Sequence, residues 1–262
     1  MQARRAAAVR VCVDFGGSST CVALAVGGRL PQVVLVDGAS LLPSAVFAEH
    51  DGTLLVGAEA LRKAEVDPTR CEPHPKRHLD EGRLLLGDAV VEVLDVVTAV
   101  LDRAVTEARG VAGGAVVDEL VLTHPAQWGA LRTRLLRQAG VGLAAETLLC
   151  QEPVAAAMFH AARREMPAGA VFAVLDLGGT TVHASVLRCE PAGGFTVLAT
   201  RGDPHFGGDD LDELMIELAR EGIPADRQAQ WRELLAGDDL ARRSSLRVLR
   251  ADARSAREAL SA

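Results

Sequence analysis

Apolar residues in this chain follow two alternating patterns. Short apolar runs rich in β-branched residues predict strands, and they include VRVCV, CVALAV, DELVLTHP, ETLLCQ, AVFAVL, VHASVL and FTVLATRGD. Apolar residues recurring at intervals of three and four predict helices at residues 57–65, 88–109, 128–139, 152–165 and 209–221, with an amphipathic helix pair at 225–262. Strands alternating with helices predict a mixed α/β protein.

Two glycine-rich turns, DFGGSST at residues 14–20 and DLGGTT at 176–181, each join two of the predicted strands. Glycine permits a sharp turn and lets backbone amides approach an anion closely. The aspartate that ends each first strand can face Mg²⁺ or an ordered water. The repeated arrangement therefore predicts a phosphate group held between two similar halves.

The segment between the first turn and the long helix is irregular. Residues 31–57 predict short strands separated by turns, and the Asp-Gly pairs at Asp37 and Asp51 predict hairpins. The proline-rich segment PTRCEPHPKRH predicts a loop, and MPAG at residues 166–169 predicts a joint between two lobes.

Three further features are candidate site residues. Glu152 lies where a strand ends and a helix begins, so its carboxylate can join Asp14 and Asp176 around a hydrated Mg²⁺, although such an acid also stabilises a helix start by itself. Lys76, one of only two lysines, can reach a terminal phosphate or be a solvated loop residue. Gly207 and Gly208 precede an acidic helix start, whose acids we expect to cap that helix.

Composition narrows the choice of function. The chain has 262 residues, 49% of them hydrophobic, which is enough for two lobes with a substantial core, and a net charge of −7 argues against nucleic-acid binding. The histidines lack metal-ligand spacing, so the sequence predicts no zinc site. Five scattered cysteines and the absence of a long apolar stretch predict a cytoplasmic protein that does not span a membrane.

The sequence predicts neither a P-loop nor a Rossmann nucleotide-binding site, because it has neither GxxxxGK[ST] nor GxGxxG after a strand. Its elements instead resemble, in order, the nucleotide-binding domain of the 70-kDa heat-shock (DnaK-type) chaperones of the actin, sugar-kinase and chaperone ATPase superfamily. The resemblance rests on VDFGGSSTCVALA, LPSAVFAEHDGTLLVGAEA, DPTRCEPHPKRHL, LVLTHPAQW, QEPVAAAMFHA, VLDLGGTTVHASVL, GDPHFGGDDLDELM and RSAREALSA.

This resemblance implies an α/β actin-like ATPase (ribonuclease H-like) fold, with two lobes around a cleft that binds ATP or ADP with Mg²⁺. It places Asp14, Glu152 and Asp176 around the metal, largely through water, and makes Lys76, Glu152 and Asp176 the catalytic residues. The nucleotide-binding residues it implies are Asp14, Gly16, Gly17, Ser18, Gly178, Gly179, Thr180, Thr181, Gly207, Gly208, Arg257 and Ser261.

The resemblance also divides the chain. We expect residues 1–165 to form lobe I, with a small inserted subdomain at about 31–100, and residues 166–262 to form the first part of lobe II, with a helical subdomain starting at about 225–262. Family members continue with the rest of lobe II and a substrate-binding domain. The second lobe is therefore expected to be incomplete, and client polypeptides and co-chaperones are expected partners through the missing regions.

Two departures from the family pattern bear on activity. The first turn usually carries a threonine where this chain has Gly17, and the second motif usually ends in an aspartate where this chain has His183. We therefore expect an ATP-binding chaperone domain with weak hydrolysis. The alternatives are a nucleotide-binding scaffold without turnover and, less favoured, a small-molecule kinase of the same superfamily.

Overall fold

A mixed β-sheet organises the first half of the molecule in the computed structural model, which describes residues 7–236 and 239–260. Its strands run in the order β11-β10-β1-β2-β3, and β4 also pairs with β2. Strands β10 and β11 are parallel to β1, whereas β2 is antiparallel to it. The bounds are β1 (Val9–Phe15), β2 (Ser19–Val26), β3 (Gln32–Val33), β4 (Leu42–Pro43), β10 (Glu119–His124) and β11 (Glu146–Gln151).

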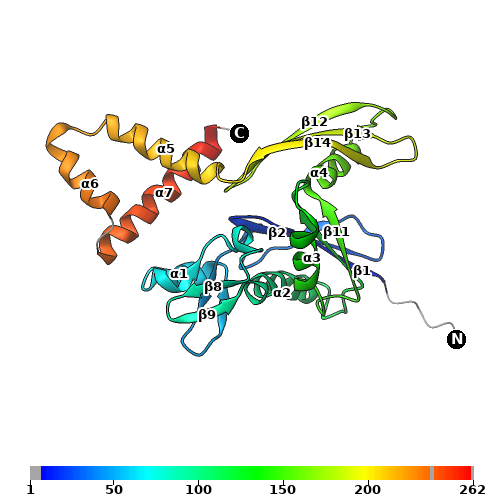
Figure 1. The fold of residues 1–262 in the computed structure, drawn as a ribbon, viewed down its shortest axis with the longest axis horizontal. Helices are drawn as coiled ribbons and strands as arrows, with labels where there is room; N and C mark the ends of the chain where they lie inside the picture. Colours follow the sequence, from blue (N-terminus) through cyan, green and yellow to red (C-terminus); the bar gives the residue numbers. More distant parts are fainter. Residues whose placement is uncertain (1–6, 237–238, 261–262) are drawn as a thin grey trace.

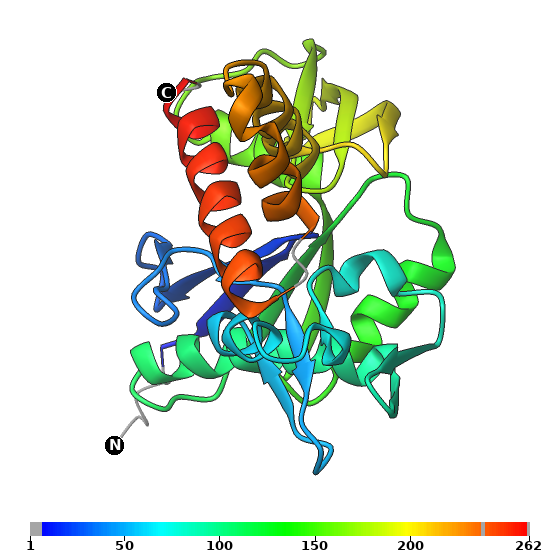
Figure 2. The ribbon, with the colours of Figure 1, turned by 90° about the vertical axis from the view of Figure 1, so that its left-hand side faces the viewer.

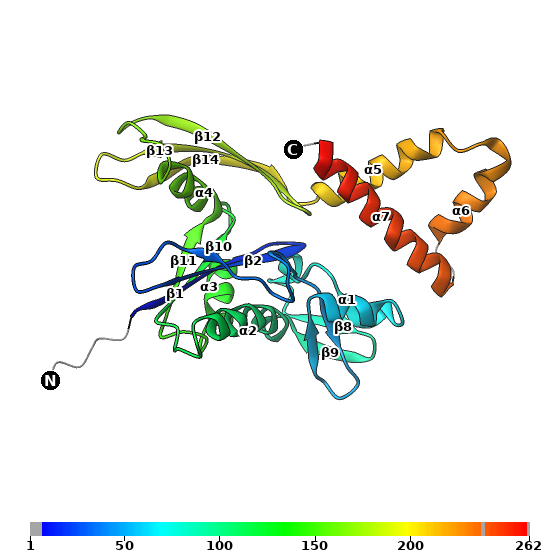
Figure 3. The ribbon, with the colours of Figure 1, turned by 180° about the vertical axis from the view of Figure 1, so that it is seen from behind.

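Helix α2 (Val93–Val111) supplies the main packing surface of this sheet, and Figures 1 and 3 show it running along one side. Its buried residues repeat at three and four positions, as the sequence predicts: Val93, Val96, Val97, Val100, Leu101, Ala104, Val105 and Ala108. They form one core with the inward residues of β1, β2 and β10. Helix α3 (Ala130–Ala139) packs against α2 on the same side.

The predicted start of this helix at Asp88 is wrong. Residues before Val93 form a hairpin of β8 (Arg83–Leu86) and β9 (Ala89–Glu92), which the sequence analysis missed. The backbone turns at Gly87, whose φ of 64° suits glycine. The apolar residues at positions 90, 91 and 93 fit the spacing of a helix or of a strand, because the run is so short. Pairing with β8 decides in favour of the strand.

The segment before this hairpin contains β5 (Val46–Ala48), β6 (Leu54–Val56), α1 (Ala58–Ala64) and β7 (Cys71–Glu72). Both predicted Asp-Gly turns are confirmed. Asp37 and Gly38 have φ of 52° and 81° between bridged residues, and Asp51-Gly52 connects antiparallel β5 and β6. The proline-rich segment is more regular than predicted, because 3₁₀ turns form at Pro68–Arg70 and Pro75–His78.

A second, antiparallel sheet contains β12 (Val171–Leu177), β13 (Val182–Cys189) and β14 (Phe195–Asp203). Helix α4 (Glu152–Ala161) contacts all three of these strands as well as β10 and β11. It therefore lies between the two sheets, as Figure 1 shows. The layers are α2 and α3, the first sheet, α4, and the second sheet.

Three helices follow β14, namely α5 (Gly208–Glu221), α6 (Gln228–Ala236) and α7 (Leu240–Leu260). They confirm the predicted helix at 209–221 and the amphipathic pair after it. Helix α7 packs on α5 and reaches back toward the first half of the chain, where Arg247 forms an ion pair of 3.1 Å with Glu65. Figure 2 shows α7 in red crossing toward the cyan segment that contains α1. Among the described residues, none of the helices is both long and apolar enough to cross a membrane.

Replacing Leu101 by alanine should test the α2 core, because its side chain is fully buried. The free energy of unfolding should fall by about 2–5 kcal/mol through lost burial and the remaining cavity. Urea unfolding followed by tryptophan fluorescence measures the change. Leu131→Ala, at a residue that is 49% exposed, is the matched control and should cost much less; equal losses would contradict this account of the core.

Candidate functional site

The two glycine turns face each other and interlock. Each is closed by the same backbone hydrogen bond, from Gly16 N to Ser19 O at 3.1 Å and from Gly178 N to Thr181 O at 2.9 Å. A Cβ atom on Gly17 would overlap the side chain of Thr180. Each turn therefore fits the other only because one of the facing positions lacks a side chain.

The second pair of facing residues, Gly179 and Ser18, fits in the same way, since a Cβ on Gly179 would overlap the hydroxyl of Ser18. A third glycine segment then docks on the second turn. The amides of Gly208 and Asp209 donate to the carbonyls of Gly178 and Gly179, both at 2.8 Å, and a Cβ on Gly207 would lie 2.6 Å from the backbone of Gly179. The start of α5 is thus positioned by direct backbone contact with the second turn.

A cavity of about 330 Å³ lies beside the interlocked turns. It brings together most of the residues singled out from the sequence, which come from both sheets, α4, α5 and α7: Asp14, Gly16, Gly17, Ser18, Lys76, Glu152, Asp176, Gly178, Gly179, Thr180, Thr181, Gly208 and Arg257. Gly207 is not in its lining and instead packs behind the turn. Ser261 lies outside the described residues.

Carboxylates from three elements converge at this cavity. Asp14 ends the first strand and accepts a hydrogen bond of 2.5 Å from the hydroxyl of Thr123, while Glu152 begins α4. Desolvation by the surrounding protein raises the pKa of Asp176, and the negative charges of Glu152 and Asp14 raise it further. The site therefore has an excess of negative charge that a bound cation would relieve.

Lys76 supplies a positive charge inside the cavity. The 3₁₀ turn at Pro75–His78 carries it, and its ammonium lies 2.6 Å from Glu152 Oε1 and 5.3 Å from the ring centre of Trp128. The side chains of Lys76 and Glu152 are only 12% and 15% exposed. The lysine is held by an ion pair and an aromatic face rather than extended into solvent.

Neighbours of Lys76 connect the two turns, which the sequence reasoning missed. His74 Nδ1 lies 3.2 Å from the carbonyl of Gly17, and the guanidinium of Arg77 donates to the carbonyl of Thr180 at 3.1 Å. The only sequence signal was the basic cluster around Lys76. A second cavity of about 570 Å³, lined partly by Lys76 and Trp128, adjoins this junction and was also missed.

Helix α7 closes the other end of the site. Arg257 Nε lies 2.6 Å from Asp212 Oδ1, and Arg254 donates to Asp209 at 2.7 Å, so both arginines bind α5 next to its glycine start. Burial by packing leaves Asp212 only 4% exposed. These ion pairs place Arg254, Arg257 and the adjacent Glu258 on the cavity wall.

A family model described as Hsp70 protein matches residues 86–262 of the chain. The chain belongs to the Hsp70 family. The resemblance seen in the sequence is thereby confirmed, and so is the fold class, because the family has the actin-like ATPase fold and the structure is mixed α/β with several sheets. Membership supports a chaperone-type, ATP-binding domain.

The residues at the site fit the nucleotide and metal that this family implies. Glycines of both turns line the cavity, where backbone amides can approach a phosphate, and the cavity wall carries Lys76 and Arg257 as counter-charges. Carboxylate oxygens are the ligands that Mg²⁺ prefers. Asp14, Glu152 and Asp176 therefore match a hydrated magnesium ion in chemistry.

Exchanging the two facing residues, Gly17→Thr with Thr180→Gly, tests the interlock. Gly17→Thr alone should lower the melting temperature, because the new Cβ overlaps Thr180, and the double exchange should recover most of the loss. Differential scanning calorimetry of both single variants and the pair gives a coupling energy, expected in the range of about 0.5–3 kcal/mol. Strict additivity would show that the turns do not interlock. Gly129→Ala, in open space, is the control for adding a methyl group.

Asp176→Asn tests whether the pKa of the Asp176 carboxyl group is raised in the folded protein. Because the pKa of Asp176 is raised in the folded state, the native protein holds a proton that the unfolded chain has released. Its contribution to stability therefore falls as pH rises from the ordinary aspartate pKa through the raised value. The melting temperature of Asp176→Asn relative to wild type should increase over this window and then level off. Exposed Asp102→Asn is the control; a pH-independent difference for Asp176→Asn would refute the assignment.

Proposed function

We propose that this chain binds MgATP in the cavity beside the two interlocked glycine turns and hydrolyses it slowly, as the nucleotide-binding domain of a DnaK-like chaperone. The observation that carries the proposal is the convergence of both turns, three carboxylates and Lys76 on one cavity of about 330 Å³. The proposal takes residues 1–165 as lobe I, with an inserted subdomain at about 31–100, and residues 166–262 as the first part of lobe II.

Backbone amides and hydroxyls of the turns would bind the phosphates, using Gly16 to Ser18 on one side and Gly178 to Thr181 on the other. Asp14, Glu152 and Asp176 would hold Mg²⁺, mainly through water. When bound, the ion supplies positive charge that neutralises charge developing on the phosphates during transfer to water. Arg257, and Ser261 outside the described residues, would face the adenosine.

Lys76 and the carboxylates would act on the attacking water. The Lys76 ammonium, already paired with Glu152 at 2.6 Å, would stabilise negative charge at the transferred phosphoryl group. The raised pKa of Asp176 makes its carboxylate a stronger base, suited to accept a proton from water at one Oδ atom. Glu152 would orient the lysine.

A scaffold that binds nucleotide without turnover is the second candidate. It is favoured by two observations, the interlock that brings Thr180 onto Gly17 and the presence of buried His183 beside the carboxylates. Gly17 also carries no hydroxyl where the family pattern has a threonine, and His183 supplies an imidazole where that pattern has a carboxylate. At the level of the family, client polypeptides and co-chaperones are the proposed partners, and the cytoplasm is the proposed location.

Lys76→Ala separates hydrolysis from scaffolding. Single-turnover hydrolysis of MgATP should slow by at least about tenfold, because one positioned charge in a water-poor site contributes more than 1.4 kcal/mol to the transition state. Lys63→Ala is the matched control, since Lys63 is the other lysine and pairs with Glu49 at the surface. It should leave the rate unchanged.

Two results would overturn these proposals. Isothermal titration showing no MgATP binding at millimolar nucleotide would reject both the ATPase and the nucleotide-binding scaffold. Binding with a single-turnover rate that Lys76→Ala does not alter would reject hydrolysis and leave the scaffold.

A further inference from the structure

His183 is a buried imidazole in the middle of the carboxylate cluster. It lies on β13, where it pairs with Asp176 on β12 and with Gly202 on β14, and its residue is only 6% exposed. A Cβ on Gly202 would lie against its ring, so the glycine provides the space that the ring occupies. The His183 ring therefore fits here because the neighbouring strand β14 has a glycine, Gly202, at the facing position.

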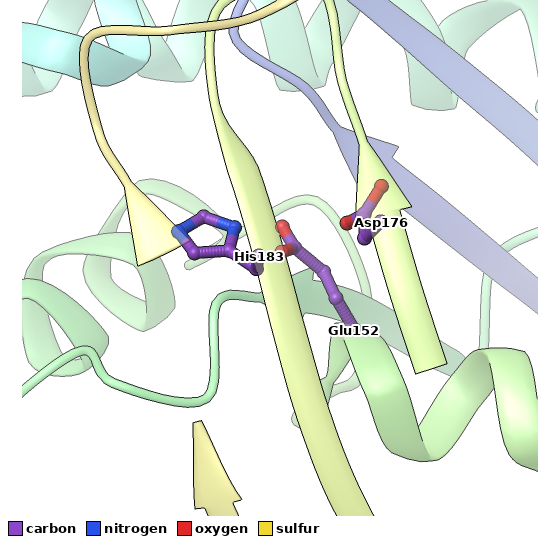
Figure 4. Close-up of side chains that lie close together, drawn as sticks. All are labelled: Glu152, Asp176 and His183. Carbon is purple, nitrogen blue, oxygen red and sulfur yellow. The ribbon is translucent and has the colours of Figure 1, made fainter. Parts of the chain in front are cut away.

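The ring is oriented by a hydrogen-bond partner outside the cluster. The side-chain amide of Gln127 contacts Nε2 of His183. Figure 4 shows one ring nitrogen directed toward the Glu152 carboxyl group and the other pointing away from both acids. Turning the Gln127 amide, whose nitrogen faces Nε2 here, lets its oxygen accept the Nε2 proton and leaves the other ring nitrogen with a lone pair for a metal ion, the usual arrangement of a ligating histidine and its outer partner.

Glu152, Asp176 and His183 each offer a ligand atom, and these three atoms lie within 4.8 Å of one another. A divalent ion bonded at about 2.0–2.2 Å separates any two of its ligand atoms by at most about 4.4 Å, so small side-chain rotations are enough to close the site. Glu152 uses Oε1 for Lys76, which leaves its second oxygen available.

The donor set determines which ion fits. Two carboxylates and one imidazole give a mixed oxygen and nitrogen site, and imidazole favours borderline first-row ions over Mg²⁺, which prefers oxygen ligands throughout. The negative charge of Asp14 acts on the same cluster, and the Lys76 ammonium opposes it. With three carboxylates facing one ammonium, the surroundings still favour a divalent cation.

We propose that Glu152, Asp176 and His183 bind a borderline divalent transition-metal ion, of which Zn²⁺ and Co²⁺ are examples, more tightly than Mg²⁺. The site shares two acids with the proposed MgATP site but requires no nucleotide. This metal site therefore goes beyond the proposed function, and it can be tested independently of nucleotide binding. Because the three ligands come from α4, β12 and β13, no local spacing of histidines in the sequence could indicate the site.

Nuclear magnetic resonance of the nucleotide-free protein labelled with ¹⁵N-histidine tests the site directly. Added ZnCl₂ should shift the ring resonances of His183, identified by their loss in His183→Gln, and MgCl₂ at equal concentration should not. This readout separates the site from zinc bound by the five cysteines, which are all free thiols. A His183 signal that ZnCl₂ leaves unmoved would overturn the proposal.

Affinity measured by competition with a chromophoric zinc chelator gives the second test. Gln127→Ala should weaken zinc binding by about 10–100-fold, as loss of an outer-sphere partner does, and His183→Gln should weaken it further. Exposed His160→Gln is the matched control and should have no effect. Unchanged affinity in His183→Gln would refute the assignment.

His183→Asp keeps the proposal testable if His183→Gln fails to fold. This variant retains three ligands but makes all of them oxygen, so the preference for Zn²⁺ over Mg²⁺ should fall by at least about tenfold. An unchanged preference would contradict the role of the imidazole. Titrating ATP separately distinguishes the outcomes, because failure of nucleotide binding leaves the zinc result standing, and the reverse also holds.

Discussion

The contact between the two glycine turns is the constraint on which the rest of the site depends. Thr180 occupies the space beside Gly17, and Ser18 occupies the space beside Gly179, so the two turns fit together with no room for a further side chain at either glycine. The start of α5 then docks on the second turn through two backbone hydrogen bonds. Close-packed backbone of this kind tolerates little change in volume, which makes the position of every neighbouring side chain sensitive to these glycines.

Charge balance is the second constraint. Asp14, Glu152 and Asp176 are brought together by strand ends and a helix start, and Lys76 is the ammonium that meets them, 2.6 Å from Glu152. The pKa of Asp176 is raised first by desolvation and then by the negative charges of Glu152 and Asp14. Cation binding relieves the repulsion among these charges, so the same repulsion favours an ion in the site. Membership of the Hsp70 family connects this chemistry to nucleotide binding.

Local signals in the sequence predicted most of the elements but not all of their boundaries. The Asp-Gly turns at Asp37 and Asp51 were predictable because they need particular backbone angles that few residues adopt. The start of α2 was not, because the apolar residues just before Val93 suit a strand as well as a helix. Pairing of β9 with β8 decides that case, and such pairing is not encoded in the periodicity of either strand alone.

By itself, the sequence determined the strand-turn-strand units, the amphipathic face of α2 and the kinds of residue that gather at the site, because each depends on neighbours within a few positions. Only the tertiary structure decided which side chains meet. His74 and Arg77 contact opposite turns, Gln127 orients His183, and Arg257 pairs with Asp212 across 45 positions. The physical reason is that ion pairs and steric fit act over a few ångströms in space, while the chain separates these partners by tens of residues.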